Sequence, residues 1–221
     1  MSHSCHGDAR DWLRFPLFAV LGAALAGACA KSQPAADVPG PASPLPTAGL
    51  AGQRVAVYPL TLIAADEATR WGDSLTPRRA ALDRADSVIG EALTQRSPEV
   101  TWVLPAEVRR TARRGTGMLA DPDQMGTALL RAPGLRTIPD PLRSQMRSLT
   151  AAAADRYALV PASLIYTPSE DAEGGGRAEL TLVLADVRTG AVGWRTVAWA
   201  SGSGPWDALW RALKTLTPSL P

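Results

Sequence analysis

Residues 180–194 read LTLVLADVRTGAVGW, and this stretch decides the class of fold. Leucine occupies every second position from 180 to 184, which predicts a strand with one apolar face. Gly190 then stands where a tight hairpin turn requires a positive φ angle. The stretch therefore predicts two antiparallel strands, at residues 178–187 and 191–200, joined by a short turn.

Strands and helices alternate before this hairpin. The apolar run VAVYPLTLI at residues 55–63 predicts a buried strand, and Pro59 predicts its end or a bulge because proline cannot donate to a sheet ladder. A helical stripe follows over residues 77–95, then a strand at 100–104 and a helix at 105–114. This order predicts a parallel strand pair joined by a right-handed crossover. Thr76 is the expected N-cap of the first helix.

The later segments complete the predicted fold. Residues 115–140 are broken by glycine and proline, with a short helix expected from a cap at Asp121 to Arg131. A helix at 141–155, a strand at 157–166 kinked at Pro161, and a closing helix after Gly204 follow. The prediction is an α/β fold with a single mixed sheet of about five strands, a parallel βαβ first half and an antiparallel C-terminal hairpin, packed with about four helices.

The N-terminus has the pattern of an export signal. An apolar run at residues 17–28 ends at Cys29, and its twelve residues span only about 18 Å as a helix, too short for a bilayer. Small residues at the expected positions before the cut, Ala26 and Ala28, predict cleavage before Cys29. The expected organisation has four parts. These are a signal peptide at 1–28, a flexible Pro/Ala-rich tether at 29–52, one α/β domain at 53–217 and a tail at 218–221.

Cleavage at this point would leave a chain without histidine. His3, His6 and the second cysteine, Cys5, all lie in the removed segment. Catalytic Ser-His-Asp or Cys-His groups and Cys/His zinc sites are therefore excluded, and we expect no metal and no cofactor. The formal net charge of +2 is too small to indicate nucleic-acid binding.

The segment LAGA followed by Cys29 resembles the lipobox of bacterial lipoproteins, in which the cysteine is acylated, although leucine stands one position early. The remainder resembles a family of periplasmic α/β lipoprotein domains. That family includes the curli secretion-channel lipoprotein, the lipoprotein activators of penicillin-binding proteins and the N-terminal domain of TolB. The resemblance is carried by the runs VAVYPL, TWVLPAEV and AAAADRYALVPASL and by the hairpin at 180–194. These resemblances imply membrane lipid bound through acylated Cys29 and binding of an envelope protein or self-association. Ala30, rather than an acid, follows the cysteine, which by analogy with lipoproteins of two-membrane bacteria predicts an outer-membrane location facing the periplasm.

Five side chains are candidate partner-binding residues. Trp71 follows the first strand beside Asp66, Glu67 and Asp73, where an open α/β sheet places ligands, although a solvated loop is the favoured explanation of these acids. Two of the candidates, Arg109 and Arg113, lie on a basic face of the second helix, which also reads as an ordinary solvated face. The last two, Trp206 and Trp210, are one turn apart on the closing helix, where core packing is the alternative.

The sequence thus predicts a lipid-anchored, non-enzymatic module that binds a protein or assembles with copies of itself. Two alternatives stay open: an envelope enzyme that acts on cell-wall glycans with carboxylates alone, and a small-ligand-binding lipoprotein.

Overall fold

The computed structural model describes residues 42–115, 117–153, 155–169 and 175–217. The predicted signal peptide, Cys29, most of the tether and the tail lie outside these residues. The helices are α1 (Thr47–Leu50), α2 (Arg78–Arg96), α3 (Pro105–Arg114), α4 (Leu142–Ala153) and α5 (Pro205–Lys214). The 3₁₀ helices are η1 (Glu67–Thr69), η2 (Asp73–Leu75), η3 (Pro122–Gln124) and η4 (Thr127–Arg131). The strands are β1 (Arg54–Val57), β2 (Ile63–Ala65), β3 (Thr101–Val103), β4 (Tyr157–Pro168), β5 (Gly176–Asp186) and β6 (Ala191–Gly202).

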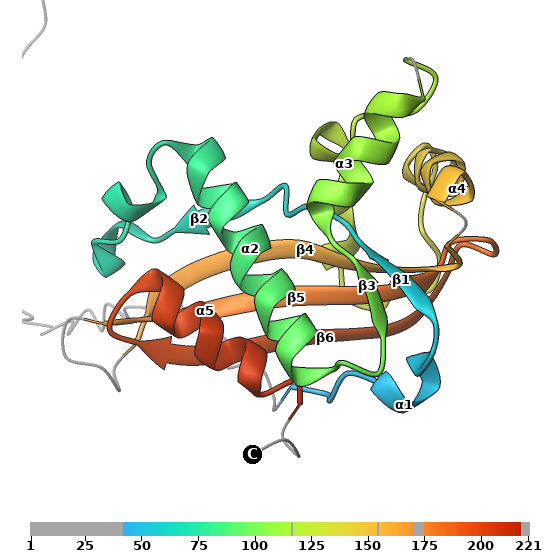
Figure 1. Cartoon of the computed structure of the whole chain (residues 1–221). Coiled ribbons are helices and arrows are strands. Elements are labelled where there is room, and N and C mark those ends of the chain that lie inside the picture. The colour runs from blue at the N-terminus through green and yellow to red at the C-terminus, as the bar shows by residue number, and fades with distance from the viewer. Residues whose placement is uncertain (1–41, 116, 154, 170–174, 218–221) are drawn as a thin grey trace, which may run out of the picture. The chain divides into compact units, whose positions relative to one another are not determined.

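These strands form one mixed sheet in the order β3-β1-β4-β5-β6, with β2 also paired to β4 (Figure 1). β1 runs parallel to β3 and β4, whereas β4, β5 and β6 are antiparallel neighbours. The predicted α/β fold, the parallel pair and the C-terminal hairpin are therefore confirmed. Gly190 in the hairpin turn has a φ of 78°, the positive value that the turn was expected to need.

The sheet has six strands because Pro59 divides the first apolar run. β1 pairs with β4 from Val55 onward, and β2 resumes pairing with the same strand at Ile63. Between them lies a short connection, residues 58–62, that contains Pro59, whose nitrogen carries no hydrogen to donate. The prediction that this proline ends the strand is confirmed, and the chain continues along the same neighbour after the interruption.

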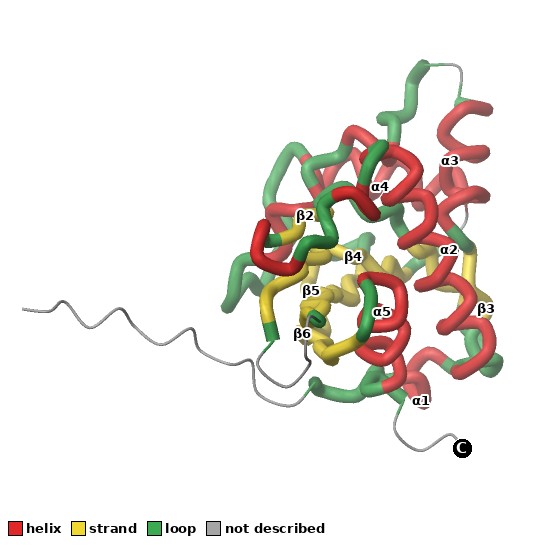
Figure 2. Tube along the Cα trace, turned by 90° about the vertical axis from the view of Figure 1, so that its left-hand side faces the viewer, coloured by secondary structure: helices red, strands yellow, loops and turns green. Residues whose placement is uncertain are grey.

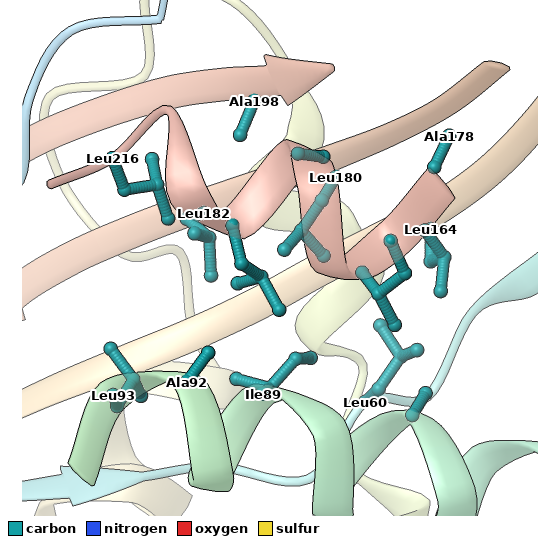
Figure 3. Close-up of a cluster of buried hydrophobic side chains, with 14 of the residues drawn as sticks. Leu60, Ile89, Ala92, Leu93, Leu164, Ala178, Leu180, Leu182, Ala198 and Leu216 are labelled. Atoms are coloured by element: carbon teal, nitrogen blue, oxygen red, sulfur yellow. The ribbon is translucent and has the colours of Figure 1, made fainter. Parts of the chain in front are cut away.

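Each face of the sheet has its own apolar core. α2 and α5 cover one face, where Ile89, Ala92 and Leu93 of α2 point toward Leu180 and Leu182 of β5 (Figure 3). The apolar groups of α3, α4, η3 and η4 pack with the opposite face. Figure 2 shows α4 and α5 on different sides of strands β4 to β6. No helix within the described residues is long and apolar enough to cross a membrane.

Order begins before the predicted end of the tether. Leu45 and Leu50 are 5% and 3% exposed, and the Leu45 N–H donates to the carbonyl of Leu216. The expectation of a flexible tether up to residue 52 is wrong for its last residues, because these two leucines pack into the core beside α5.

Two local predictions also change. The N-cap of α2 is Pro77 and has no side-chain cap, while the Thr76 hydroxyl donates to the carbonyl of Gly72 instead. The single short helix expected after Asp121 is replaced by the two 3₁₀ helices η3 and η4. Asp121 does cap η3, because its carboxylate accepts the N–H of Asp123. The expected irregularity at Pro161 is confirmed as a register shift in β4.

Candidate binding site

A groove of about 800 Å³ lies on the sheet face that also packs with α3 and α4. Its floor contains Ser163 of β4 and Thr181 of β5, which are directly paired across the two strands. One wall is the segment 126–133, which includes η4. The lining residues are Leu62, Gly126, Ala128, Leu129, Arg131, Ala132, Pro133, Ser163 and Thr181. The groove is thus mostly apolar, with two hydroxyls in its floor and one cation at its edge.

The tight turn of η4 sends two adjacent leucines in different directions. Successive residues of a 3₁₀ helix point about 120° apart, so neighbours cannot share one surface. Leu130 is fully buried in the core beneath the groove, whereas Leu129 is 59% exposed in its wall. Only two large apolar side chains are this exposed within the described part of the chain, and Leu129 is one of them.

Two hydrogen bonds hold this wall to the rest of the domain. The buried hydroxyl of Thr127 is bonded to the hydroxyl of Thr61 at 2.8 Å, which joins the start of η4 to the β1–β2 connection. At the other end, the Arg195 guanidinium of β6 donates to the carbonyl of Arg131. The wall is therefore fixed at both ends, and Leu129 is presented on a supported turn.

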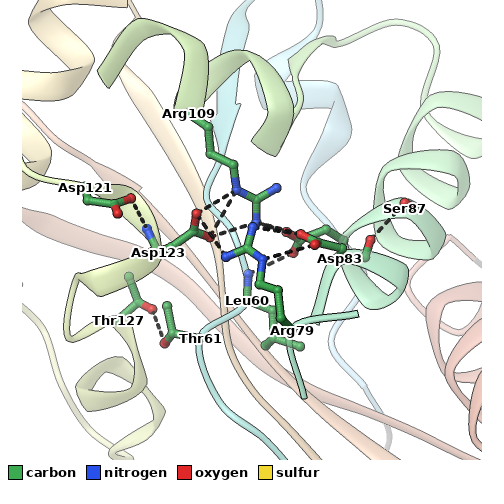
Figure 4. Close-up of polar contacts among 10 residues, drawn as sticks. Leu60, Thr61, Arg79, Asp83, Ser87, Arg109, Asp121, Asp123 and Thr127 are labelled. Carbon is green, nitrogen blue, oxygen red and sulfur yellow. Dashed lines mark hydrogen bonds and ion pairs between the residues drawn. The ribbon is translucent and has the colours of Figure 1, made fainter. Parts of the chain in front are cut away.

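An ion-pair cluster centred on Arg109 includes Asp123 of η3, which precedes this wall in the chain (Figure 4). The Arg109 guanidinium lies 2.6 Å from the Asp86 carboxylate, 2.8 Å from that of Asp123 and 3.6 Å from that of Asp83. Arg79 adds a second cation at 3.2 Å from Asp123. Because these residues come from α2, α3 and η3, the cluster fastens both helices to the segment that leads into η4.

Burial sets the electrostatics of the cluster. It raises the pKa of Asp86 from 3.8 to about 6, against the hydrogen bonds from Leu60 and Arg109 that lower it. Burial also acts to raise the pKa of Asp123, but hydrogen bonding and charge from Arg109 outweigh it and hold that pKa below its usual value. Burial acts to lower the pKa of Arg109, but hydrogen bonds and charge from Asp123 and Asp86 outweigh burial and hold that pKa above its usual value. The guanidinium therefore stays charged.

The predicted lip around Trp71 does not form. Trp71 is 6% exposed, and its ring lies edge-on to Tyr166 with 5.4 Å between the ring centroids. The prediction of Trp71 as an exposed binding residue is wrong, because the ring fills the core beside β4. Asp66 is exposed, and its carboxylate accepts the N–H of Ala68 at the start of η1. Asp66 thus serves as a cap there.

The two candidate arginines of α3 have different environments. Arg109 does not lie on a solvated face, because its side chain is 13% exposed and is held in the cluster. Arg113 is exposed and borders a cavity of about 300 Å³ together with Asp121, one turn from Arg109. The structure places neither of them in the lining of the main groove.

The two tryptophans of α5 are half-buried at the edge of the core. α5 is firmly docked, since Leu209 and Leu213 are 0% and 3% exposed. The Arg84 guanidinium lies 4.7 Å from the ring centroid of Trp206, and the Lys214 ammonium lies 5.9 Å from that of Trp210. Each ring thus packs against the core and is also in contact with a cation. α5 is therefore not a loosely docked helix whose two tryptophan rings are both free to bind a partner.

The groove residues were missed in the sequence. Leu129 and Arg131 lie in the stretch of residues 115–140, where glycine and proline interrupt any periodic pattern. The available signal was the pair of adjacent leucines in GTALLRAPG, because a tight turn cannot bury both. No group of three or more metal-ligating side chains occurs among the residues that the structure describes.

Comparisons with known proteins give structural likeness only. Neither the protein-family models nor the curated proteins include a match. Among solved structures, the chain is similar to the PelC dodecamer from Paraburkholderia phytofirmans at 18% identity, with a TM-score of 0.40 over 80% of this chain and 94% of that one. It is similar to the LpoB C-terminal domain from Escherichia coli at 16% identity, with a TM-score of 0.42 over 69% and 85% of the two chains. It is also similar to lipoprotein GNA1162 from Neisseria meningitidis at 17% identity, with a TM-score of 0.33 over 67% and 80%. With TM-scores below 0.5, these likenesses establish no shared family and no shared function.

Proposed function

We propose that this chain is a lipid-anchored, non-enzymatic module of the bacterial cell envelope that binds a protein partner in the groove beside η4. The observation that carries the proposal is the exposed Leu129 on a wall that is fixed at both ends. An apolar side chain presented on a rigid turn loses little conformational entropy when a partner covers it. Leu129 thus has the properties of a partner-binding anchor.

The chemistry of the groove supports binding rather than catalysis. Arg131 is the one ionisable side chain among its nine lining residues. An arginine stays protonated and cannot exchange a proton at neutral pH, so the lining offers no acid–base pair. The two hydroxyls of the floor, Ser163 and Thr181, have no histidine to activate them, since both histidines precede Cys29.

The envelope location rests on the lipobox-like segment before Cys29. Acyl chains on this cysteine would hold the domain at a membrane, and the outer membrane facing the periplasm is the location that we propose. The described residues begin at 42, so twelve residues of the proposed tether, 30–41, separate Cys29 from them. In a polyproline conformation it would span about 37 Å, so the groove would stay close to the anchoring membrane.

Lipidation is tested by metabolic labelling with a radioactive fatty acid. We expect label on the full-length protein and none on Cys29→Ala, with the variant released from the membrane fraction. Equal labelling of the two proteins would refute the anchor.

The groove is tested by site-specific photo-crosslinking in intact cells. A photoreactive residue at position 129 should give a discrete adduct with one envelope protein, because this side chain is exposed in the groove wall. Position 91 is the matched control, since Glu91 is also exposed but lies on α2, on the opposite face of the sheet. Adducts of the same pattern and amount at both positions would reject the groove as the partner site.

A further inference from the structure

The chain segment that contains the groove wall, residues 105–153, is rich in arginines that form no ion pair among the residues that the structure describes. Residues 105–153 carry eight arginines and four acids, whereas residues 42–104 carry six arginines and seven acids. Of these eight arginines only Arg109 takes part in an ion pair within the described residues. The acids are largely engaged, because Asp123 pairs with Arg109, Asp121 caps η3 and Asp140 accepts from Ser144. Among the residues that the structure describes, the positive charge of this segment is therefore largely without a paired acid.

A further arginine, Arg195 of β6, is linked to the groove wall at Arg131. Arg131 ends η4 and lines the groove, and Arg195 reaches over from β6 to the carbonyl of Arg131. That bond uses one nitrogen of the Arg195 guanidinium. The Nε–H of the same side chain is buried and has no acceptor within the described residues. A buried donor without an acceptor costs free energy, and the positive charge of this guanidinium favours a carboxylate nearby.

The lining of the groove contains both apolar side chains and a cation. Leu62 and Leu129 lie in the lining, and the wall continues through Arg131 to Pro133. A bound segment would bury apolar side chains against the leucines and place carboxylates beside the two arginines. Charge complementarity of this kind both speeds association and excludes basic partners.

We infer that the groove binds an extended, acidic segment of a protein partner, with apolar side chains against Leu62 and Leu129 and carboxylates at Arg131 and Arg195. This inference rests on the proposed function, because it names the class of partner for the same groove. A membrane surface is the competing explanation for the charge. A flat bilayer would meet the exposed arginines of α3, such as Arg110 and Arg113, and would not enter a groove.

The test compares two charge-reversal pairs in the full-length protein that carries the photoreactive residue at position 129. Arg131→Glu with Arg195→Glu should lower the adduct yield in intact cells by about tenfold or more, because like charges now face the partner. Arg110→Glu with Arg113→Glu, a matched control on exposed positions of α3, should leave the yield within about twofold. Circular dichroism at equal concentration confirms that both variants remain folded. Mass spectrometry of the adduct should locate the crosslink in a partner segment with a net negative charge.

Each other outcome overturns the inference in a recognisable way. If no adduct forms at position 129 in the parent protein, the groove is not the partner site and the proposed function fails with the inference. If an adduct forms but survives reversal at Arg131 and Arg195, or maps to a neutral or basic segment or to a second copy of this chain, the inference alone is wrong. Flotation with phosphatidylglycerol vesicles that is lost in the α3 pair, together with a groove pair that crosslinks normally, would assign the arginines to a membrane surface.

Discussion

Replacement of Asp86 by asparagine should remove a defined pH dependence of stability. Burial raises the pKa of this carboxyl to about 6 in the folded chain, from an ordinary value of 3.8. Between these two pH values the folded chain keeps a proton that the unfolded chain has released, so the free energy of unfolding falls as the pH rises. A difference of about two pKa units corresponds to about 3 kcal/mol. Asp86 is 5% exposed, so solvent screens this effect little.

The measurement is urea unfolding of wild type and Asp86→Asn at pH 4, 5, 6 and 7. Carboxyls outside the Arg109 cluster titrate equally in both proteins, so the difference between the two curves reports Asp86 together with its coupling to Asp123. We expect the variant to gain stability relative to wild type by about 2.4 kcal/mol between pH 4 and pH 7, since part of the total change lies below pH 4. Curves that stay parallel would refute the reasoning, because Arg109 would then fully offset the cost of burying the charge.

Asp86→Ala is the companion variant in the same experiment. It also removes the titration, but it takes away the acceptor of the Leu60 N–H, which is 2.8 Å from the Asp86 carboxylate. A buried N–H left without an acceptor costs about 1–3 kcal/mol. The alanine variant should therefore be less stable than the asparagine variant by this amount at every pH.

Two further pairs of substitutions test the packing around the groove and the core. Leu130→Ala should cost about 2–5 kcal/mol in urea unfolding because the side chain is fully buried, whereas Leu129→Ala should change stability by less than about 0.5 kcal/mol; similar losses would contradict the opposite orientations of the two leucines. Tyr166→Phe should raise the melting temperature slightly, since its buried hydroxyl has no hydrogen-bond partner within the described residues. Tyr58→Phe should lower the melting temperature, because it removes the bond to the Thr150 hydroxyl at 3.1 Å; equal shifts in the two variants would contradict this assignment.

The periodic parts of the sequence predicted the fold well, because in them local pattern and burial coincide. The stripe through Ala85, Ile89 and Ala92 faces the sheet as expected, since an amphipathic helix has one way to bury it. The sequence likewise predicted the position of Gly190 in the hairpin turn, because this turn needs a conformation that glycine adopts without strain.

The ion-pair cluster was not predictable from the same pattern. Asp86 lies next to Ala85 on α2, and an acidic side chain gives no local sign of burial. Its burial depends on a contact with the β1–β2 connection, 26 residues earlier in the chain, which no local periodicity records. The groove escaped prediction for a related reason, because η3 and η4 are too short to repeat any pattern.

The interruption at Pro59 connects these missed features to one another. Once proline ends β1, the next N–H, that of Leu60, leaves the sheet ladder and needs an acceptor in the interior. Asp86 supplies it at 2.8 Å, and a buried carboxylate in turn requires a cation, which Arg109 provides.

Arg109 then has donors left for Asp123, which is how the cluster comes to hold η3. Thr61, in the same connection, bonds Thr127 at the start of η4. The residues that an unbroken strand would have placed in the sheet ladder therefore position the wall that presents Leu129. Pro59 interrupts a buried strand, and through these contacts the interruption helps to hold the wall of the groove in place.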